Sequence, residues 1–560
     1  MKTYKNNLKL LFAFSLALLA LVACKEDDEQ LDEATRLFRP VLNEDLYAEG
    51  NTIIVNMAKL KRAEQYQLEV SRDTFQTIEY TIQVDTNFVE INKDLIGEEL
   101  FYSTLYQVRG QALSGNSEFN SRIADFGSVR TERFPTILNL PARTDVTDIA
   151  ARLTWSVLGA DVTEIRVFAE NDLRLENALF APRPVTSTEA ETGEAIVTGL
   201  SPVTTYQIAI YSGDAEKTLR GWVNYTTREA DVDPTRSDVI DIRDQTDPTA
   251  VENAVLAAPA GSIILIAHGS SYDLPSTPLN KSITIQAAYG FGDQKAVLST
   301  GSGSSNWNLD SSVSNIDYIK FINVELRGAD IGGHYVFNPS SGSINVGEVS
   351  FEKCKLTNFR GIMRIRANII VDEFVISNSI VDSIGNYGIF TTDTNPGTPQ
   401  TATVNNIRLL NSSFNYIELG IQSRNNSETI EIESCTFANF IKGSRFVFRY
   451  RGGSGNDNVT GGISIKNSIF GHSWDEGNTG VYGIQGINQG LENTSFDISN
   501  NFTTANFFFT SNPITGLPEG NYTGTQEDLW VDPANGDFNF SDRGFSGRFD
   551  TGDPRWRVQL

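Results

Sequence analysis

The amino-acid sequence predicts an all-β protein in which two β-sandwiches precede a right-handed parallel β-helix. Asn, Ser, Thr, Gly and Phe are abundant, whereas Ala- or Leu-rich helical stretches are scarce. Short alternating strands fill residues 39–228, and beyond residue 235 one turn motif recurs at intervals of 23 to 33 residues. The strands indicate sandwiches, and the recurring motif indicates stacked coils.

The N-terminus predicts export and lipidation. Lysines precede an apolar run of 13 residues, Leu10–Val22, which is too short to span a bilayer comfortably. Leu21–Cys24 resembles the lipobox of bacterial lipoproteins, in which the cysteine is acylated and becomes the new N-terminus. We therefore expect a signal peptide at 1–24 and a lipid on Cys24. The alternative is an ordinary secretory signal cut near Ala23.

An acidic tether is expected at 25–38. Lys25–Glu29 resembles the signal that directs Bacteroidota-type lipoproteins to the extracellular face of the outer membrane. The resemblance implies outer-membrane lipid as a partner, held through Cys24. The other interpretation is a solvated acidic tether, which is compatible with the targeting role. An acylated cysteine is a stable anchor, so no transmembrane helix is required.

Composition excludes several function classes. The formal net charge is −25, which argues against nucleic acid as a partner because its phosphates would be repelled. Cys354 and Cys435 are the cysteines left after processing, so a disulfide framework is not expected. His268, His334 and His472 are too scattered to predict a histidine metal site.

Two sandwich domains are predicted, at 39–133 and 134–228. Tyr66–Val70 in the first and Tyr206–Tyr211 in the second are alternating strands. Domains of this kind usually act as spacers or docking modules, so we expect them to hold the β-helix away from the membrane.

The two segments share a marker of a leucine followed six residues later by a tyrosine that opens a strand. The pairs are Leu100 with Tyr106 and Leu200 with Tyr206. This spacing predicts a tyrosine corner, with the ring buried and its hydroxyl bonded to upstream backbone. The second pair and its Ser-Pro-Val-Thr-Thr spacer resemble the signature of fibronectin type III domains, whose core tryptophan Trp155 matches. The first pair lacks the proline.

A parallel β-helix is predicted over 235–560, with a cap at its start and an extension at its end. Ala250–Ala257 is a helix-compatible stretch before the apolar Ile263–Ile266, as expected of a helix that covers the open first coil. The repeat starts are predicted at Phe321, Phe351, Ile376, Leu409, Ile432, Ile465 and Ile498. The apolar first residue should point inward, and the Asn or Ser two places on suits a turn.

The same register accounts for the cysteines. Cys354 and Cys435 occupy the fourth position of their repeats, three coils apart. At about 4.8 Å per coil their backbones should be roughly 14 Å apart, which is too far for a disulfide. We expect both to be small buried hydrophobic residues.

Together with the C-terminal sequences Asp532–Phe538 and Gly552–Trp556, the repeats resemble the β-helix lipoproteins of Bacteroidota-type polysaccharide-utilisation loci. These carry fibronectin-like domains before an uncharacterised pectate-lyase-like helix. The resemblance implies a surface protein with a polysaccharide ligand and a neighbouring glycan-uptake complex as partners. Fold alone does not establish the activity.

The second strand of each coil carries the candidate glycan-binding residues. Arginine forks bind carboxylates or sulfates, and aromatic rings stack on sugars. The alternative is a solvated face whose arginines pair with Glu428, Glu431 or Asp393, and buried positions for the aromatics. The candidates are Arg364, Arg366, Tyr387, Arg424, Arg445, Arg449, Tyr450, Arg451, Trp474 and Tyr482.

Three functions remain open. The leading hypothesis is capture of a polysaccharide without cofactor or metal. The second is a polysaccharide lyase, with Lys442 and Arg449 as basic residues and Ca²⁺ held by clustered acids, or a hydrolase. Asp393 is a lone acid on these strands, which argues against a hydrolase there. The third is a structural or adhesive spacer.

Overall fold

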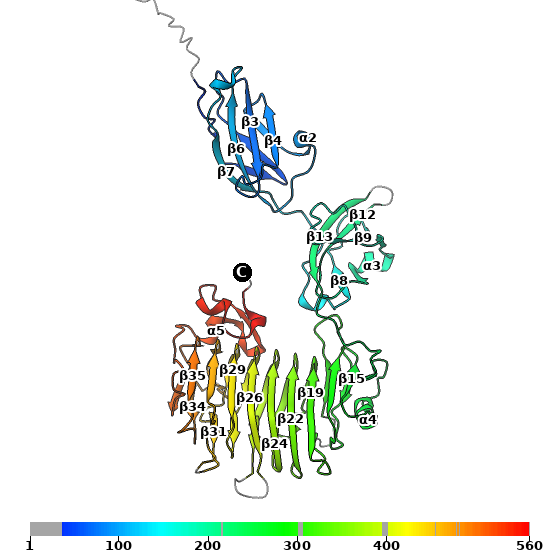
Figure 1. Cartoon of the computed structure of the whole chain (residues 1–560), viewed down its shortest axis with the longest axis vertical. Coiled ribbons are helices and arrows are strands. Elements are labelled where there is room, and N and C mark those ends of the chain that lie inside the picture. Colours follow the sequence, from blue (N-terminus) through cyan, green and yellow to red (C-terminus); the bar gives the residue numbers. More distant parts are fainter. Residues whose placement is uncertain are drawn as a thin grey trace, which may run out of the picture. The chain divides into compact units, whose positions relative to one another are not determined.

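The computed structural model describes residues 36–213, 217–300, 306–394, 401–453, 455–477, 479–480 and 482–558 (Figure 1). The predicted signal peptide, its Cys24 and most of the tether lie outside these residues. Within the described part of the chain, no helix is long and apolar enough to cross a membrane. The chain divides into two compact units, and the second sandwich contributes residues to both.

The first sandwich has one sheet in the order β4-β3-β6-β7 and another in the order β1-β2-β5. The hydroxyl of Tyr106 accepts a hydrogen bond from the backbone N–H of Phe101 at 3.0 Å, and the ring is fully buried. The predicted tyrosine corner is therefore present here. The elements are β1 (Tyr47–Glu49), β2 (Thr52–Asn56), β3 (Gln65–Ser71), β4 (Tyr80–Val84), β5 (Phe88–Ile91), α2 (Lys93–Ile96), β6 (Leu105–Leu113), η1 (Ser117–Phe119) and β7 (Ala124–Arg130).

The second sandwich has one sheet in the order β10-β9-β12-β13 and a second of β11 and β8. Trp155 and Tyr206 are both buried, as the sequence predicts for a core tryptophan and a corner tyrosine. The elements are η2 (Arg143–Asp145), β8 (Ala150–Thr154), β9 (Val162–Ala169), β10 (Arg183–Pro184), α3 (Ser187–Thr192), β11 (Glu194–Thr198), β12 (Thr205–Ser212) and β13 (Thr218–Thr226).

The remaining chain forms a parallel β-helix, which confirms the predicted fold class. Its first sheet has ten parallel strands in chain order. The sheet begins before the predicted cap. Strand β14 precedes the helix at Ala250–Ala257 in the sequence and pairs with β15, which follows that helix. The strands are β14 (Val239–Asp241), β15 (Ser262–Ile266), β17 (Ile283–Ala287), β19 (Asn315–Ile322), β22 (Ser343–Glu352), β24 (Asn368–Ser377), β26 (Thr403–Leu410), β29 (Thr429–Glu433), β32 (Ile463–Lys466) and β35 (Phe496–Ser499).

The second and third sheets are joined because two long strands, β23 and β25, run from one into the other. The second sheet comprises β16 (Ser271–Asp273), β18 (Ala296–Ser299), β20 (Val324–Arg327), β23 (Lys355–Ile365), β25 (Ile380–Thr392), β27 (Ser413–Ile417), β30 (Thr436–Phe440), β33 (Ile469–Phe470) and β36 (Phe502–Thr503). The third comprises the later halves of β23 and β25 with β21 (Tyr335–Phe337), β28 (Ile421–Ser423), β31 (Phe446–Tyr450), β34 (Gly483–Ile487) and β37 (Phe508–Ser511).

All seven predicted repeat starts lie side by side in the first sheet. Phe321 pairs with Phe351, Phe351 with Ile376, and the ladder continues to Ile498. Phe321 and Phe351 stack in parallel at 5.3 Å between ring centroids inside the coil. The apolar first position therefore points inward, as predicted.

The turn after each of these strands has left-handed backbone. Non-glycine residues adopt this conformation at a cost, and Asn tolerates it better than most. The third position of each repeat has a φ between 50° and 59°, which explains the preference for Asn there. The residues are Asn323, Lys353, Asn378, Asn411, Ser434, Asn467 and Asn500.

The fourth position forms a buried polar ladder. The hydroxyl of Ser379 accepts the backbone N–H of Cys354, and that of Ser468 accepts the N–H of Cys435. Both cysteines are free and buried, as predicted. Burial raises the pKa of Cys354 to about 12, so its thiol is protonated and inert.

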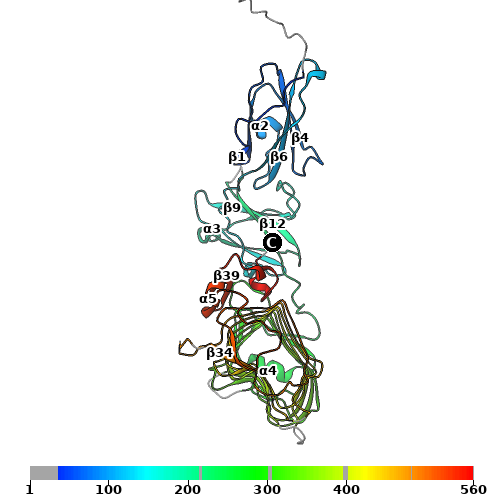
Figure 2. The ribbon, with the colours of Figure 1, turned by 90° about the vertical axis from the view of Figure 1, so that its left-hand side faces the viewer.

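Two segments cover apolar surface of the β-helix. Helix α4 (Ala250–Ala257) lies across one end (Figure 2), with its buried side chains in the main core cluster. The C-terminal segment folds back onto the second sheet, where Trp556 donates to Ser413 and Asn415 donates to the carbonyl of Pro533. It contains α5 (Gln526–Leu529), β38 (Trp530–Asp532), η3 (Pro533–Asn535), β39 (Asp537–Phe540), η4 (Ser546–Phe549) and η5 (Pro554–Trp556).

Candidate functional site

The third sheet brings predicted arginines from three coils together at the C-terminal ends of its strands, with Asp393 from a fourth coil between them. The register aligns Arg364 with Thr391, Gln422 and Arg449 in one row. Two residues farther along each strand, Arg366, Asp393, Arg424 and Arg451 follow in the same coil order. Because adjacent strands lie about 4.8 Å apart, long side chains of neighbouring coils reach one another.

Asp393 is the centre of this arginine cluster, defined by Arg364, Arg424, Arg449, Arg451 and Asp393. Its Oδ2 lies 2.5 Å from Nη2 of Arg364, and its Oδ1 lies 3.0 Å from Nη2 of Arg451 and 3.4 Å from Nε of Arg424. Burial alone would raise the pKa of Asp393. The hydrogen bond from Arg364 and the three guanidinium charges overcome this effect and lower the pKa.

Arg449 differs from the other three arginines. Among the described residues its recorded polar contact is Nη1 to Oε1 of Gln422, at 3.4 Å. The buried Nε of Arg449 has no hydrogen-bond partner among the described residues. The same is true of the buried Nε atoms of Arg364 and Arg451. Burial lowers the pKa of Arg449, and the charge of Arg424 lowers it further. Three guanidinium groups therefore share the carboxylate of Asp393, and Arg449 adds a fourth positive charge, so the cluster carries surplus positive charge.

Aromatic rings pack against Arg364, the arginine of the cluster that comes first in the sequence. The guanidinium of Arg364 lies 4.0 Å from the ring centroid of Tyr387, and that of Arg360 lies 4.9 Å from it. Tyr387 in turn makes an edge contact with Tyr335, at 5.4 Å between ring centroids. The ring of Tyr387 therefore holds arginines in place, and cation–π contacts of this kind favour planar guanidinium groups.

Other predicted residues have different surroundings. Arg366 donates from Nε to the side-chain oxygen of Asn338 at 3.0 Å, and the exposed Arg445 lies 3.4 Å from Glu418. Tyr450 requires a correction, since its ring is fully buried and its hydroxyl donates to Ser427. Alternation along β31 turns Tyr450 into the coil while its neighbours face outward, so it is unavailable to a ligand.

Lys442, Trp474 and Tyr482 lie at the other end of the third sheet, Lys442 before β31 and the two aromatic residues before β34. Trp474 is partly exposed, makes an edge contact with Tyr416 and lies under the ammonium of Lys442, which pairs with Glu476 at 2.5 Å. Tyr482 packs on His472. Among the described residues, the structure records no contact between Lys442 and Arg449, the two proposed lyase residues.

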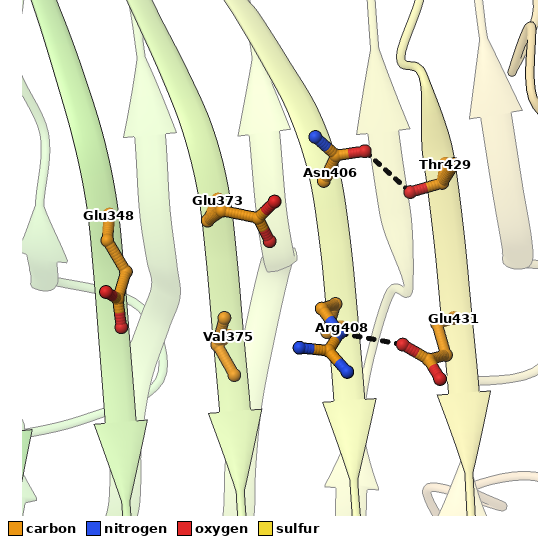
Figure 3. Close-up of a pocket in the computed structure, with 7 residues that line it drawn as sticks. All are labelled: Glu348, Glu373, Val375, Asn406, Arg408, Thr429 and Glu431. Carbon is orange, nitrogen blue, oxygen red and sulfur yellow. Dashed lines mark hydrogen bonds and ion pairs between the residues drawn. The ribbon is translucent and has the colours of Figure 1, made fainter.

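The first sheet carries a second feature, an open pocket on its outer face (Figure 3). Arg408 donates from Nε to Glu431 at 2.7 Å, and Thr429 donates to Asn406 at 2.6 Å. Glu373 extends toward the strand of Asn406 and Arg408. Burial raises the pKa of Glu373, and nearby Glu348 adds to this effect. The pocket is lined by Glu348, Glu373, Val375, Asn406, Arg408, Thr429 and Glu431.

This pocket was not predicted from the sequence. Glu431 pairs with Arg408 on the first sheet and not with a third-sheet arginine, which corrects that part of the solvated-face alternative. The sequence does carry a signal for this pocket, because charged residues alternate with buried ones along the strands of the first sheet. Among the described residues, no group of three or more His, Cys, Asp or Glu side chains is placed to hold a metal ion.

Two parts of the β-helix region match family models whose function is unassigned. Residues 270–417 match a domain of unknown function (DUF4957), and residues 430–556 match another domain of unknown function (DUF5123). No curated protein matches the chain.

Similar solved structures include the FN1–FN3 domains of chicken CNTN1, at 14% identity and a TM-score of 0.15, covering 35% of this chain and 69% of that one. A two-domain fibronectin type III segment from chicken tenascin has 15% identity and a TM-score of 0.16, and covers 34% and 99% of the two chains.

Proposed function

We propose that this protein captures an acidic polysaccharide on the third sheet of its β-helix, at the outer face of the outer membrane. The observation that carries the proposal is the surplus of arginine around Asp393, in a chain whose formal net charge is −25. Guanidinium groups bind carboxylates and sulfates with two parallel hydrogen bonds, which suits uronates and sulfated sugars.

The surroundings support a polymer rather than a small ligand. Each coil adds outward side chains at about 4.8 Å intervals, so a chain of sugars meets a repeating surface. A lipid on Cys24 would keep the protein at the membrane, and the two sandwiches would act as a spacer. A glycan-uptake complex in the same membrane would receive the captured polymer.

Affinity gel electrophoresis tests the proposal, with the mature protein run through uronate-containing, sulfated and neutral polysaccharides. We expect retardation by an acidic polymer and at least about tenfold weaker binding for Arg449→Gln, since a lost charged hydrogen bond costs about 1.5–3 kcal/mol. Arg236→Gln, in an exposed ion pair with Asp238 outside both candidate sites, is the matched control and should bind as the wild type. Equal retardation by neutral polymers, or none by any polymer, would contradict capture and favour a spacer.

A second candidate function is hydrolysis of the same polymer at the pocket of the first sheet. The observation that favours it is Glu373, whose raised pKa suits a proton donor, beside the Arg408–Glu431 pair. Glycosidases use one carboxylic acid and one carboxylate in this way. Hydrolysis predicts new reducing ends that disappear in Glu373→Gln and persist in the exposed control Asp497→Asn. Unsaturated products, seen by ultraviolet absorbance, would indicate a lyase instead.

A further inference from the structure

We infer that the arginine cluster has places for two anions, one filled by Asp393 and the other, bounded by Arg449 with Arg424 and Arg451, for one carboxylate or sulfate ester of the ligand. This inference rests on the proposed function and deepens it. The inference distinguishes the arginines that bind the ligand from those that are paired with other side chains of the protein.

Asp393 fills the first place completely. Both of its carboxylate oxygens contact guanidinium nitrogens, and its side chain is only 17% exposed. Arg364 is committed to this place, since it also packs on the ring of Tyr387. The carboxylate of Asp393 therefore shows how an anion binds among these arginines.

The second place is defined by charges that Asp393 does not balance. Arg449 has no carboxylate partner among the described residues, and it faces the amide oxygen of Gln422. Arg451 reaches Asp393 with one nitrogen while its buried Nε has no partner. Arg424 and Arg451 both contact Oδ1 of Asp393, and the register places Arg449 on the same coil as Arg451, next to the coil of Arg424. Burial lowers the pKa of Arg451, and the charges of Arg424 and Arg449 lower it further.

Such an arrangement favours an added anion. Cations that are partly removed from water and close to one another are destabilised unless a counter-charge is present. Arg366 and Arg445 do not contribute to this place. Arg366 is hydrogen-bonded to Asn338, and Arg445 is paired with Glu418. One oxyanion with two or three acceptor oxygens would satisfy Arg449 and the remaining donors of Arg451.

Arginine side-chain NMR with small probes tests the place without a polymer. Inorganic sulfate and free glucuronate are titrated separately into the mature protein at constant ionic strength, and the Nε–H signals are followed. We expect one saturable shift, absent in Arg449→Gln and retained in Arg366→Gln. The probe that saturates at lower concentration distinguishes sulfate esters from carboxylates. Shifts that do not saturate with either probe, or that persist in Arg449→Gln, would overturn the inference.

Polysaccharide binding gives a second readout with the opposite sign. Asp393→Asn removes a like charge beside the ligand anion, so binding of the acidic polymer should strengthen by roughly threefold or more at low salt. Circular dichroism checks that the variant is folded. Weaker binding by a folded Asp393→Asn would overturn the two-place arrangement. If the wild type binds acidic polymers and Arg449→Gln binds equally well, this inference fails while capture stands. Saturable sulfate binding without any polymer binding would reject capture alone.

Discussion

Nη2 of Arg364 lies 2.5 Å from Oδ2 of Asp393, and both side chains are less than one-fifth exposed. The two residues come from adjacent coils of the third sheet, 29 positions apart in the sequence. This ion pair joins the two coils at the point where the candidate site begins, so its contribution to stability and to ligand binding must be measured separately.

Asp393→Asn should lower the free energy of unfolding of the β-helix by about 3 kcal/mol, because it leaves partly buried arginines without their carboxylate. The pKa of Asp393 is lowered below 3.8, so the carboxylate stabilises the fold above this pH, and the effect is lost as the pH falls through the lowered pKa. Urea unfolding at pH 7 and at pH 3 measures both effects. An equal loss for Arg408→Gln would show that the ion pair has no special role.

Ser379→Ala should cost about 1–3 kcal/mol, because the buried backbone N–H of Cys354 loses its acceptor. Ser377→Ala, two residues earlier and partly exposed, is the matched control and should change stability by less than about 0.5 kcal/mol. Chemical denaturation of both variants measures the difference. If the two substitutions cost the same, the polar ladder is not a source of stability.

Lys353→Asn should stabilise the protein by about 1 kcal/mol. Lys353 has a φ of 55° at a turn where neighbouring coils have Asn, and Asn tolerates left-handed backbone at lower cost. Among the described residues its ammonium forms long ion pairs, at 3.5 Å to Glu352 and 3.8 Å to Glu229, so little is lost. The reciprocal change Asn378→Lys should destabilise by a similar amount. Thermal midpoints that shift in the same direction would contradict this account.

Glu527 should make docking of the C-terminal segment sensitive to acid. The hydrogen bond from His472 lowers the pKa of Glu527 from 4.5 to about 2. The contact therefore adds stability above pH 4.5, and this contribution is lost as the pH falls toward 2. Hydrogen exchange of residues 526–545 should accelerate over this range in the wild type. In Glu527→Gln it should already be faster at pH 6 and change less with pH.

The coil register was predictable from the sequence because each coil repeats the same local requirements. An inward apolar residue, a left-handed turn and a small buried residue recur at fixed offsets, and these features predicted the ladder from Phe321 to Ile498. The two free cysteines followed from the same offsets. The arginines Arg364, Arg424, Arg449 and Arg451 were predicted as candidates because they share equivalent strands.

Burial and pairing were less predictable. Tyr450 is adjacent to two outward arginines in the sequence, yet strand alternation buries it. Glu431 is close in sequence to the arginines of the third sheet, but its side chain lies on the first sheet and pairs with Arg408. The pocket around Glu373 was missed because its residues come from four coils whose lateral alignment depends on loop lengths.

The all-β class, the coil repeat and the inert cysteines could be predicted from residue patterns, because they depend on local periodicity and turn conformation. The folded chain was needed to show that three arginines share Asp393 and that Arg449 contacts an amide oxygen. It was also needed to show that the C-terminal segment covers the second sheet. These partners are 27 to 143 residues apart in the sequence, so their distance in space depends on how the coils stack rather than on any local pattern.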